Sequence, residues 1–204
     1  MCSSLYCRSS MSINQRSSVR IISGSKRGSK VQFLAAPGLR PSGDRIRETL
    51  FAWVQTSISG SRCLDMFAGS GALGFEAASR GAERVVMLEK NSVAAASLQE
   101  NADRLRFDNV DIYAADALTA DTYQLKLPGH QFDLLFIDPP FAENLHQTAI
   151  DLVQQQQLLK PDALIYLETG KRDNLQQVPV HWRLFREKVA GEVRIQLYRT
   201  IAAE

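Results

Sequence analysis

A glycine-rich stretch between a strand-like run and a helix-like run is the feature that most limits how this chain can fold. It reads Leu64-Asp65-Met66-Phe67-Ala68-Gly69-Ser70-Gly71-Ala72-Leu73-Gly74. Glycines at this spacing let the backbone turn sharply and approach a ligand, and the helix that follows presents unpaired N–H groups in its first turn. The stretch therefore predicts a site for a nucleotide-type cofactor in an α/β fold. The alternative interpretation is that the glycines serve only the tight turn.

Runs typical of strands and helices alternate along the rest of the chain. Strands are expected over residues 62–67, 84–89, 110–114, 132–137 and 163–168, and helices over residues 73–80, 93–105 and 145–158. Two further strand-like runs, 182–189 and 193–200, flank Ala190-Gly191 and predict a closing hairpin. This alternation is typical of a parallel sheet with helices on both faces. The expected fold class is α/β and Rossmann-like, with a seven-stranded, mostly parallel sheet, an antiparallel C-terminal hairpin and an N-terminal β-hairpin extension.

The N-terminal quarter of the chain has patterns of a different kind. Residues 19–22 and 30–34 are short strand-like runs around a Gly/Ser/basic turn, which predicts a β-hairpin with a cationic tip, and a helix is expected from Gly43-Asp44 to about residue 58. We therefore expect a disordered leader (1–18), a basic hairpin and helix (19–60) and a cofactor-binding catalytic domain (61–204). The leader is rich in serine and has no acid; the alternatives are a targeting segment, or a start codon placed too early with Met11 as the true start.

The charge of the chain is divided unevenly along its length. Residues 1–50 carry nine basic and two acidic residues, a net charge of +7, whereas residues 51–204 carry 15 basic and 20 acidic residues, a net charge of −5. A basic arm on an acidic body suggests a polyanionic partner. The 45% hydrophobic content excludes a fully disordered chain, and no apolar run approaches the roughly 20 residues that span a bilayer. Three scattered cysteines argue against a disulfide framework or a metal site, and they fit a cytoplasmic protein.

Carboxylates around the glycine-rich stretch narrow the choice of cofactor. Asp65 ends the first strand, where it would repel a pyrophosphate but suit a cationic amino-acid group, which favours S-adenosylmethionine over a dinucleotide. Glu89 ends the next strand, where a carboxylate can accept hydrogen bonds from ribose hydroxyls. Asp116 follows the third strand, where it either contacts an adenine amino group or is only a loop or helix-capping acid. The expected cofactor-binding residues are Asp65, Phe67, Gly69, Ser70, Gly71, Glu89, Lys90, Asp116 and Ala117.

A second motif, Asp138-Pro139-Pro140-Phe141, closes the apolar strand-like run 132–137. Two consecutive prolines remove two backbone donors, so the local backbone presents only carbonyl acceptors. An exocyclic amine could donate its N–H groups to the Asp138 carboxylate and the Pro139 carbonyl, which would turn its lone pair toward an electrophile, while Phe141 stacks on the base. These four residues are the expected catalytic site. The alternative is a rigid turn that merely ends a buried strand.

The two motifs in this strand order resemble class I S-adenosylmethionine-dependent amino-methyltransferases, which modify adenine N6, cytosine N4 or guanine N2. The chain is more similar still to the bacterial RsmD family, which methylates guanine N2 in small-subunit (16S) ribosomal RNA. This closer resemblance covers about residues 19–200, and Ser42-Gly43 departs mildly from the family, which usually has Thr and another small polar residue there. Beyond the two motifs, it rests on Arg20-Ile21-Ile22-Ser23-Gly24, Arg27-Gly28, Leu39-Arg40-Pro41-Ser42-Gly43-Asp44-Arg45-Ile46-Arg47-Glu48-Thr49-Leu50-Phe51 and Arg186-Glu187-Lys188-Val189-Ala190-Gly191.

The resemblance implies a monomeric enzyme that uses S-adenosylmethionine and acts on 16S ribosomal RNA in an assembled or assembling small subunit. No metal and no catalytic histidine are expected, because His130, His146 and His181 are scattered outside the motifs. The basic arm would then bind RNA phosphates. The alternatives are a solvated basic face, or pairing of Arg45 and Arg47 with Asp44 and Glu48. The expected RNA-binding residues are Lys26, Arg27, Lys30, Arg40, Arg45 and Arg47.

Three other functions are weighed against this one. An adenine-N6 methyltransferase acting on DNA or RNA would keep both motifs, although the DNA enzymes usually need a separate target-recognition domain. A nicotinamide oxidoreductase would need a proton-relay residue and would leave Asp138-Pro139-Pro140-Phe141 unexplained. A non-catalytic RNA-binding module would explain the basic arm but not the glycine-rich stretch.

Overall fold

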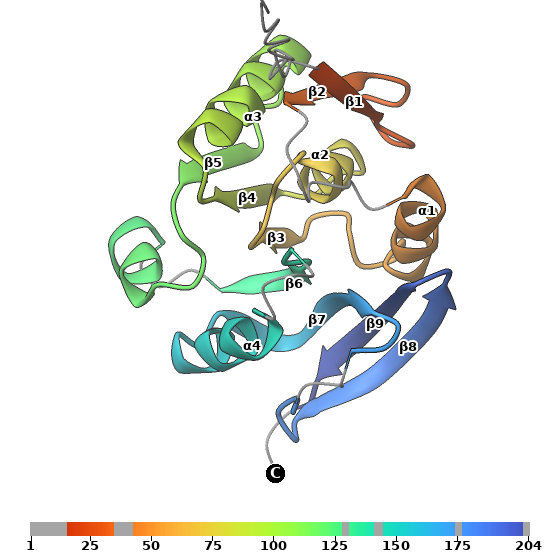
Figure 1. Ribbon diagram of the computed structural model, residues 1–204, viewed down its shortest axis with the longest axis vertical. Helices are drawn as coiled ribbons and strands as arrows, with labels where there is room; N and C mark the ends of the chain where they lie inside the picture. Colours follow the sequence, from red (N-terminus) through yellow and green to blue (C-terminus); the bar gives the residue numbers. More distant parts are fainter. Residues whose placement is uncertain (1–15, 35–42, 128–130, 141–144, 174–176, 202–204) are drawn as a thin grey trace, which may run out of the picture.

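The computed structural model describes residues 16–34, 43–127, 131–140, 145–173 and 177–201. Its large sheet has seven strands in the order β5-β4-β3-β6-β7-β9-β8, and a separate two-stranded sheet pairs β1 with β2 (Figure 1). The strands from β5 to β7 are parallel, and β9 is antiparallel to both β7 and β8. The expected fold class is therefore confirmed. The strands of the large sheet are β3 (Arg62–Asp65), β4 (Arg84–Glu89), β5 (Val110–Ala114), β6 (Phe132–Ile137), β7 (Leu159–Gly170), β8 (Trp182–Ala190) and β9 (Val193–Thr200).

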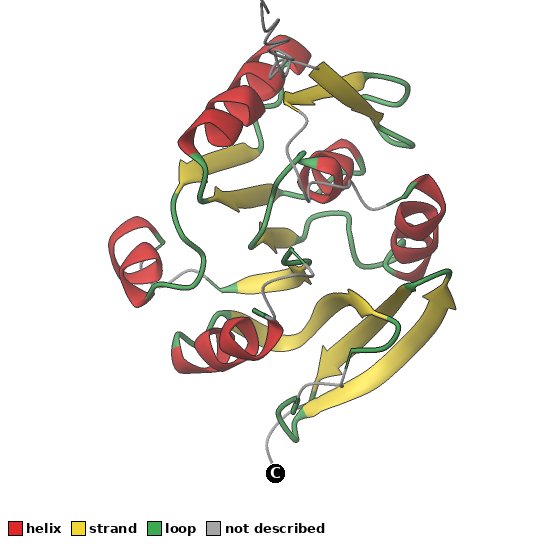
Figure 2. Ribbon diagram, viewed as in Figure 1, coloured by secondary structure: helices red, strands yellow, loops and turns green. Residues whose placement is uncertain are grey.

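Helices cover both faces of this sheet (Figure 2). The apolar run of β4 needs cover on both sides, because alternate residues of a strand point to opposite faces of the sheet. Val85 and Met87 pack into one core, and Val86 and Leu88 pack into the other. The first core includes residues of α1, α2 and α3, and the second includes residues of η1 and α4. We call these two sides the α1–α3 face and the α4 face. The helices are α1 (Asp44–Trp53), α2 (Ala72–Ser79), α3 (Ser92–Leu105), the π-helix η1 (Thr122–Lys126) and α4 (His146–Gln155).

The chain order of the strands creates a switch point between β3 and β6. From β3 the chain passes through α2 to β4 on one side, and β6 lies on the other side of β3. In open α/β sheets, ligands bind beyond the carboxyl ends of the strands at such a point. The carboxyl end of this sheet is where β3, β4, β5 and β6 stop, at Asp65, Glu89, Ala114 and Ile137. The amino end of the sheet is the opposite side, where the same strands begin.

The N-terminal hairpin consists of β1 (Arg16–Arg20) and β2 (Lys30–Leu34) and lies against α2 and α3. Its first strand begins at Arg16, so three residues of the expected leader belong to the fold. The buried carboxylate of Glu76 on α2 accepts hydrogen bonds from the backbone of Ile22 (2.7 Å) and Ser23 (3.0 Å). On α3, the Asn101 amide pairs with the backbone N–H and carbonyl of Gln32. The hairpin is thus fixed to α2 and α3 by polar contacts with buried side chains.

Several element bounds differ from the sequence-based expectation. Helix α1 ends at Trp53 and continues as turns to Ile58, and α4 ends at Gln155. Strand β7 begins at Leu159, with a register shift opposite β6 that accommodates Pro161. The π-helix η1 has no amphipathic pattern and was not expected. The division of the chain at residue 60 and the nature of residues 1–15 stay predictions, and the latter lie outside the described residues.

No helix in the described part of the chain is long and apolar enough to cross a membrane.

Candidate active site

The glycine-rich loop joins the carboxyl end of β3 to α2. Gly69 and Gly71 adopt left-handed backbone conformations, with φ of 51° and 77°. A Cβ at Gly71 would lie 2.6 Å from side-chain atoms of Leu98 and Phe75, so only glycine fits here without rearrangement. A Cβ at Gly74 would lie 2.3 Å from the Met87 side chain, where α2 packs closely on β4. The third glycine therefore serves helix–strand packing, whereas the first two shape the loop.

Asp65 is a positioning residue for this loop. Its carboxylate is almost fully buried and accepts a hydrogen bond from the Gly74 backbone N–H at 3.1 Å. Burial raises the pKa of the Asp65 carboxyl to about 7, although hydrogen bonds from the backbone of Gly74 and Phe67 oppose the rise. A cation placed beside it would restore the charged form. Contact between Asp65 and the cationic end of a cofactor stays a prediction, since the structure assigns its carboxylate to the first turns of α2.

Glu89 connects the loop to the next strand and helix. One carboxylate oxygen accepts from the Gly69 N–H at 2.9 Å and the other from the Asn91 N–H at 2.8 Å. Asn91 in turn caps α3 by accepting from two backbone N–H groups. Each carboxylate oxygen has a further lone pair, so Glu89 can still accept hydrogen bonds from a vicinal diol. Its place at the end of β4, beside the glycine loop, is the one that the sequence predicted.

Lys90 and Asp116 pair with each other between the ends of β4 and β5. The Lys90 Nζ lies 2.8 Å from the Asp116 carboxylate, whose other oxygen accepts from the Leu118 N–H at 2.9 Å. Partial burial alone would raise the pKa of the Asp116 carboxyl, but the bonds from Lys90 and Leu118 together hold it below its ordinary value. Asp116 is thus a loop acid in this structure, which was the alternative interpretation; its contact with adenine stays a prediction. Ala117 is buried, and its carbonyl accepts from the Tyr123 hydroxyl at 2.8 Å.

The Asp138-Pro139 segment lies at the switch point, next to the glycine loop. Strand β6 pairs with β3 so that Phe136 is opposite Asp65, and Asp138 follows two residues later. Asp138 is partly exposed, Pro139 is buried and Pro140 is exposed, whereas Phe141 lies outside the described residues. Strand alternation places Asp138 on the α1–α3 face with Asp65 and Glu89. The structure therefore brings the two sequence motifs together at the carboxyl end of the sheet.

A buried polar network beside Asp138 was not identified from the sequence. The Tyr166 hydroxyl on β7 donates to the Glu168 carboxylate at 2.6 Å, and the His146 Nε2 lies 2.7 Å from the Glu168 carbonyl oxygen. Burial, followed by the charges of Glu168 and Asp138, raises the pKa of the Tyr166 hydroxyl, so it stays a donor. Burial lowers the pKa of His146, which favours the neutral imidazole in this contact with the Glu168 carbonyl. The only sign of this network in the sequence is the polar pair Glu168-Thr169 at the end of an apolar strand.

The cationic residues of the arm separate into distinct environments. Arg47 is only 1% exposed; its guanidinium donates to the Arg20 carbonyl and pairs with Asp44 at 2.6 Å and Glu76 at 3.7 Å. The prediction that Arg47 binds RNA is therefore wrong, because the side chain holds α1 to the hairpin and α2. Arg45 is exposed near the start of α1, and Arg40 lies outside the described residues.

The hairpin tip lies at the amino end of the sheet, away from the glycine loop. The Ser25 N–H donates to the carbonyl of Ser79, the last residue of α2 (2.7 Å), and the Lys26 ammonium lies 5.9 Å from the centre of the Phe107 ring, just beyond α3. Because α2 begins at the carboxyl end and finishes at the amino end, its last residue marks the far side. Arg27 and Lys30 are exposed on that same side. The tip therefore does not border the candidate active site. If the basic arm held RNA directly over that site, the tip would have to lie at the carboxyl end of the sheet.

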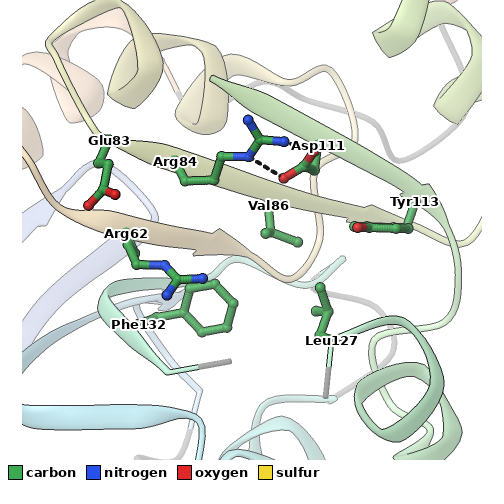
Figure 3. Close-up of a pocket in the computed structure, with 8 residues that line it drawn as sticks. All are labelled: Arg62, Glu83, Arg84, Val86, Asp111, Tyr113, Leu127 and Phe132. Atoms are coloured by element: carbon green, nitrogen blue, oxygen red, sulfur yellow. Dashed lines mark hydrogen bonds and ion pairs between the residues drawn. The ribbon is translucent and has the colours of Figure 1, made fainter. Parts of the chain in front are cut away.

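A cavity of about 500 Å³ also lies at the amino end of the sheet (Figure 3). Arg84 and Asp111 form an ion pair at its wall, and Phe132 at the start of β6 lies across from them. The glycine loop and Asp138 are at the other end of the same strands. This cavity is therefore not the cofactor site.

Comparison with known proteins now identifies the family. A family model described as "Conserved hypothetical protein 95" matches residues 19–199. A Haemophilus influenzae protein named "Ribosomal RNA small subunit methyltransferase D" is 45% identical over 188 residues, which is 91% of this chain and 96% of that protein. The chain belongs to the RsmD family of S-adenosylmethionine-dependent methyltransferases.

Two further comparisons agree with membership of the RsmD family. An Escherichia coli protein that is also named "Ribosomal RNA small subunit methyltransferase D" is 40% identical over 181 residues, covering 89% of each chain. A solved structure entitled "Putative methyltransferase yhhF from Escherichia coli" is 38% identical, with a TM-score of 0.81 over 92% of this chain and all of that one. The resemblance inferred from the sequence motifs is thereby confirmed, as are the Rossmann-like fold and the cofactor.

Proposed function

We propose that this RsmD-family protein methylates the exocyclic N2 of a specific guanine in 16S ribosomal RNA, in an assembled or assembling small subunit. The relatives named as small-subunit ribosomal RNA methyltransferases support the class of substrate. The observation that carries the proposal is the position of Asp138 and Pro139 at the end of β6, beside the glycine loop at the switch point. No proton-relay residue is needed there, because an amine that has accepted a methyl group becomes acidic and releases its proton readily.

The residues at the carboxyl end of the sheet fit S-adenosylmethionine, which supplies an electrophilic methyl group on a sulfonium sulfur. Gly69 and Gly71 keep the loop free of Cβ atoms, and Glu89 provides two carboxylate oxygens at the end of β4. Buried Asp65 adds a carboxyl whose charged form a neighbouring cation would favour. We expect Phe67, Ser70, Lys90, Asp116 and Ala117 to complete the site from the loops after β3, β4 and β5.

The chain's contribution to catalysis would be to bind and orient the target amine. A guanine amine is a poor nucleophile because its lone pair is delocalised into the ring. Acceptance of its N–H groups by the Asp138 carboxylate and the Pro139 carbonyl would favour a more pyramidal nitrogen and aim the lone pair at the methyl carbon. Positioning of this kind lowers the barrier mainly by holding the reacting atoms in line. Phe141 and Pro140 would border the base.

The same acceptor pair would also serve the N6 amine of adenine, so adenine-N6 methylation of RNA or DNA is the second candidate. The decisive experiment incubates the protein with labelled S-adenosylmethionine and small subunits, or 16S ribosomal RNA, that lack the modification. Nucleoside mass analysis should then find N2-methylguanosine. N6-methyladenosine would instead establish the second candidate on RNA, and no transfer to either substrate would refute methylation of 16S ribosomal RNA at both bases.

The role of Asp138 can be tested in the same assay. The Asp138→Ala variant should lose methyl transfer, by at least 100-fold, because its amine acceptor is gone, while its affinity for S-adenosylmethionine measured by calorimetry stays within about threefold. Asp151→Ala, an exposed acid on α4, is the matched control and should keep full activity. Loss of cofactor affinity in Asp138→Ala would show that this carboxylate belongs to the cofactor site.

A further inference from the structure

The C-terminal hairpin is a basic segment within the acidic body of the protein. Residues 182–200 contain five basic residues against two acidic ones, a net charge of +3, while residues 51–204 as a whole carry −5. Strand β8 is the outer strand of the sheet, and its residues from Arg183 to Val189 are all exposed. The exposed side chains include an aromatic one, Phe185, which is 44% exposed. Charged side chains on an edge strand commonly prevent pairing with another sheet, so a binding role depends on how these cations are arranged.

The register of β8 against β9 places the cations of β8 on one face. Residues opposite each other in antiparallel strands point to the same side of the sheet. Arg186 is opposite Leu197 and Lys188 is opposite Ile195, and both partners belong to the core on the α1–α3 face. Arg183 is opposite Arg199, two residues beyond Leu197, so this pair points the same way. We call Arg183, Arg186, Lys188 and Arg199, together with Phe185, the β8 cationic face.

The Phe185 ring contacts two of these cations, Arg186 and Arg199. The register shifts between Leu184 and Arg186, so the strand bulges at this ring. The guanidinium carbon of Arg199 lies 4.6 Å from the ring centre and that of Arg186 lies 5.1 Å away, both within cation–π range. Within the described residues, none of the four cations forms an ion pair, and the Arg199 Nε has no hydrogen-bond partner. Phe185 therefore holds two of these charges in place, and no carboxylate among the described residues pairs with any of the four.

The β8 cationic face leads toward the candidate active site. Ile195 pairs with Lys188 on one side and with Glu168 on the other, so Lys188 stands level with Glu168 at the carboxyl end of the sheet. Three inter-strand steps separate β8 from β6, which is about 14 Å. The Lys188 ammonium donates to the Thr49 hydroxyl of α1, whose own donor bond goes to the Arg45 carbonyl. Figure 1 shows this end of β8 next to α1. Exposed Arg45 lies one turn before Thr49 on α1 and thus extends the β8 cationic face.

We propose that the β8 cationic face is a docking surface for the phosphate backbone of the substrate RNA. The inference rests on the proposed function for its substrate class and adds the surface that holds the RNA near Asp138. A polyanion is the occupant that matches four cations on one face that have no acidic partner among the described residues, and contacts with Phe185 or Thr49 hold three of the four. Guanidinium groups recognise phosphate oxygens through paired N–H donors. The tip of the N-terminal hairpin, at the amino end of the sheet, would contact the RNA farther from the reacting base.

The test compares the wild-type protein with Arg183→Gln/Arg186→Gln/Lys188→Gln, titrated against small ribosomal subunits that lack the modification. Each phosphate contact lowers the slope of log K against log salt by about 0.7–0.9, so the triple variant should lose about two units of slope and bind roughly ten- to a hundredfold more weakly at 0.15 M salt. The KM for subunits should rise by a similar factor while kcat and the affinity for S-adenosylmethionine stay unchanged. Unaltered KM and slope would overturn the proposal.

Single variants and cross-linking define the partner more sharply. Arg186→Gln should weaken binding several-fold, whereas Arg84→Gln, at an exposed cation that is already paired with Asp111 at the amino end, should not. Phe185→Leu should weaken binding less than Arg186→Gln, because it removes the ring but keeps both guanidinium groups. A photoreactive phenylalanine in place of Phe185 should cross-link to nuclease-sensitive material in the subunit. A cross-link only to protein would overturn the RNA assignment. If wild-type protein formed no N2-methylguanosine, the proposed function itself would fail, independently of these results.

Discussion

One buried carboxylate, that of Glu76, joins the N-terminal hairpin to α2, and Glu76→Gln should weaken this contact strongly. The Glu76 side chain is fully buried and accepts from Ile22 N–H, Ser23 N–H and the Arg80 Nε (2.6 Å), with Arg47 at 3.7 Å. An amide of the same shape would point its NH₂ group at two of these donors. The substitution therefore tests the charge and the acceptor geometry without changing volume.

The magnitude follows from the partners that are left behind. Hydrogen bonds to a charged group contribute about 1.5–3 kcal/mol each, and removing one partner from a buried ion pair costs about 3–5 kcal/mol. Arg47 keeps Asp44 and the Arg20 carbonyl, and Arg80 is partly exposed, so both retain some compensation. We therefore expect a loss of about 3 kcal/mol in the free energy of unfolding, at the lower end of the buried-pair range.

Two measurements check this prediction. Urea unfolding should show a midpoint lower by about 1–3 M, given slopes of about 1–3 kcal/mol/M for small proteins. Hydrogen exchange should show faster exchange of the Ile22 and Ser23 amides specifically, because the hairpin would open locally before the sheet does. Glu100→Gln, at an exposed acid on α3, is the control and should change stability by less than about 0.5 kcal/mol. A loss below about 1 kcal/mol in Glu76→Gln, with both amides still protected, would refute the reasoning.

Two further predictions concern the glycine loop. Gly71→Ala should lower stability by about 1–3 kcal/mol and weaken S-adenosylmethionine binding, because it strains a φ of 77° and places a Cβ 2.6 Å from Leu98 and Phe75; equal midpoints and affinities for variant and wild type would contradict the loop geometry. Asp65 should destabilise the cofactor-free fold progressively as pH rises from about 4 to about 7, since burial raises the pKa of its carboxyl from 3.8 to about 7 and the ionised form is the less favourable one inside the protein. Asp65→Asn should therefore gain stability over wild type across that window, by urea midpoints at each pH, and a constant difference between pH 4 and 8 would disprove the raised pKa.

Much of the fold could be predicted because local patterns and long-range packing agree. The runs at residues 84–89, 110–114, 132–137 and 193–200 became β4, β5, β6 and β9 with the expected bounds. Short continuous apolar runs between turn-forming residues are typical of buried parallel strands when helices alternate with them. The element bounds that were predicted wrongly lie where tertiary contacts outweigh the local conformational preference of the residues. Strand β7 extends through Pro161 because a register shift against β6 accommodates it, and η1 has no periodic pattern at all.

The candidate site was predicted residue by residue only where chain order alone brings groups together. Parallel strands put Asp65, Glu89 and Asp138 at one end of the sheet whatever the details of packing. The partners of those groups were not predictable: Glu89 bonds to Gly69 and Asn91, and Tyr166 and Glu168 lie beside Asp138. These contacts depend on side-chain directions in a packed interior. Arg47 shows the same limit, because its sequence context resembles that of exposed Arg45 and only burial distinguishes the two.

The amino-acid sequence alone determines the family, the cofactor and the carboxyl-end location of the candidate site in this protein, since spacing along the chain and strand order carry that information. Only the tertiary structure decides which charges face the substrate. Charge counted along the chain assigns the basic character to the first 50 residues. Folding buries Arg47, takes the hairpin tip to the amino end of the sheet and aligns Arg183, Arg186 and Lys188 on one face of β8. The physical reason is that electrostatic recognition depends on distance and exposure in three dimensions, and linear order fixes neither.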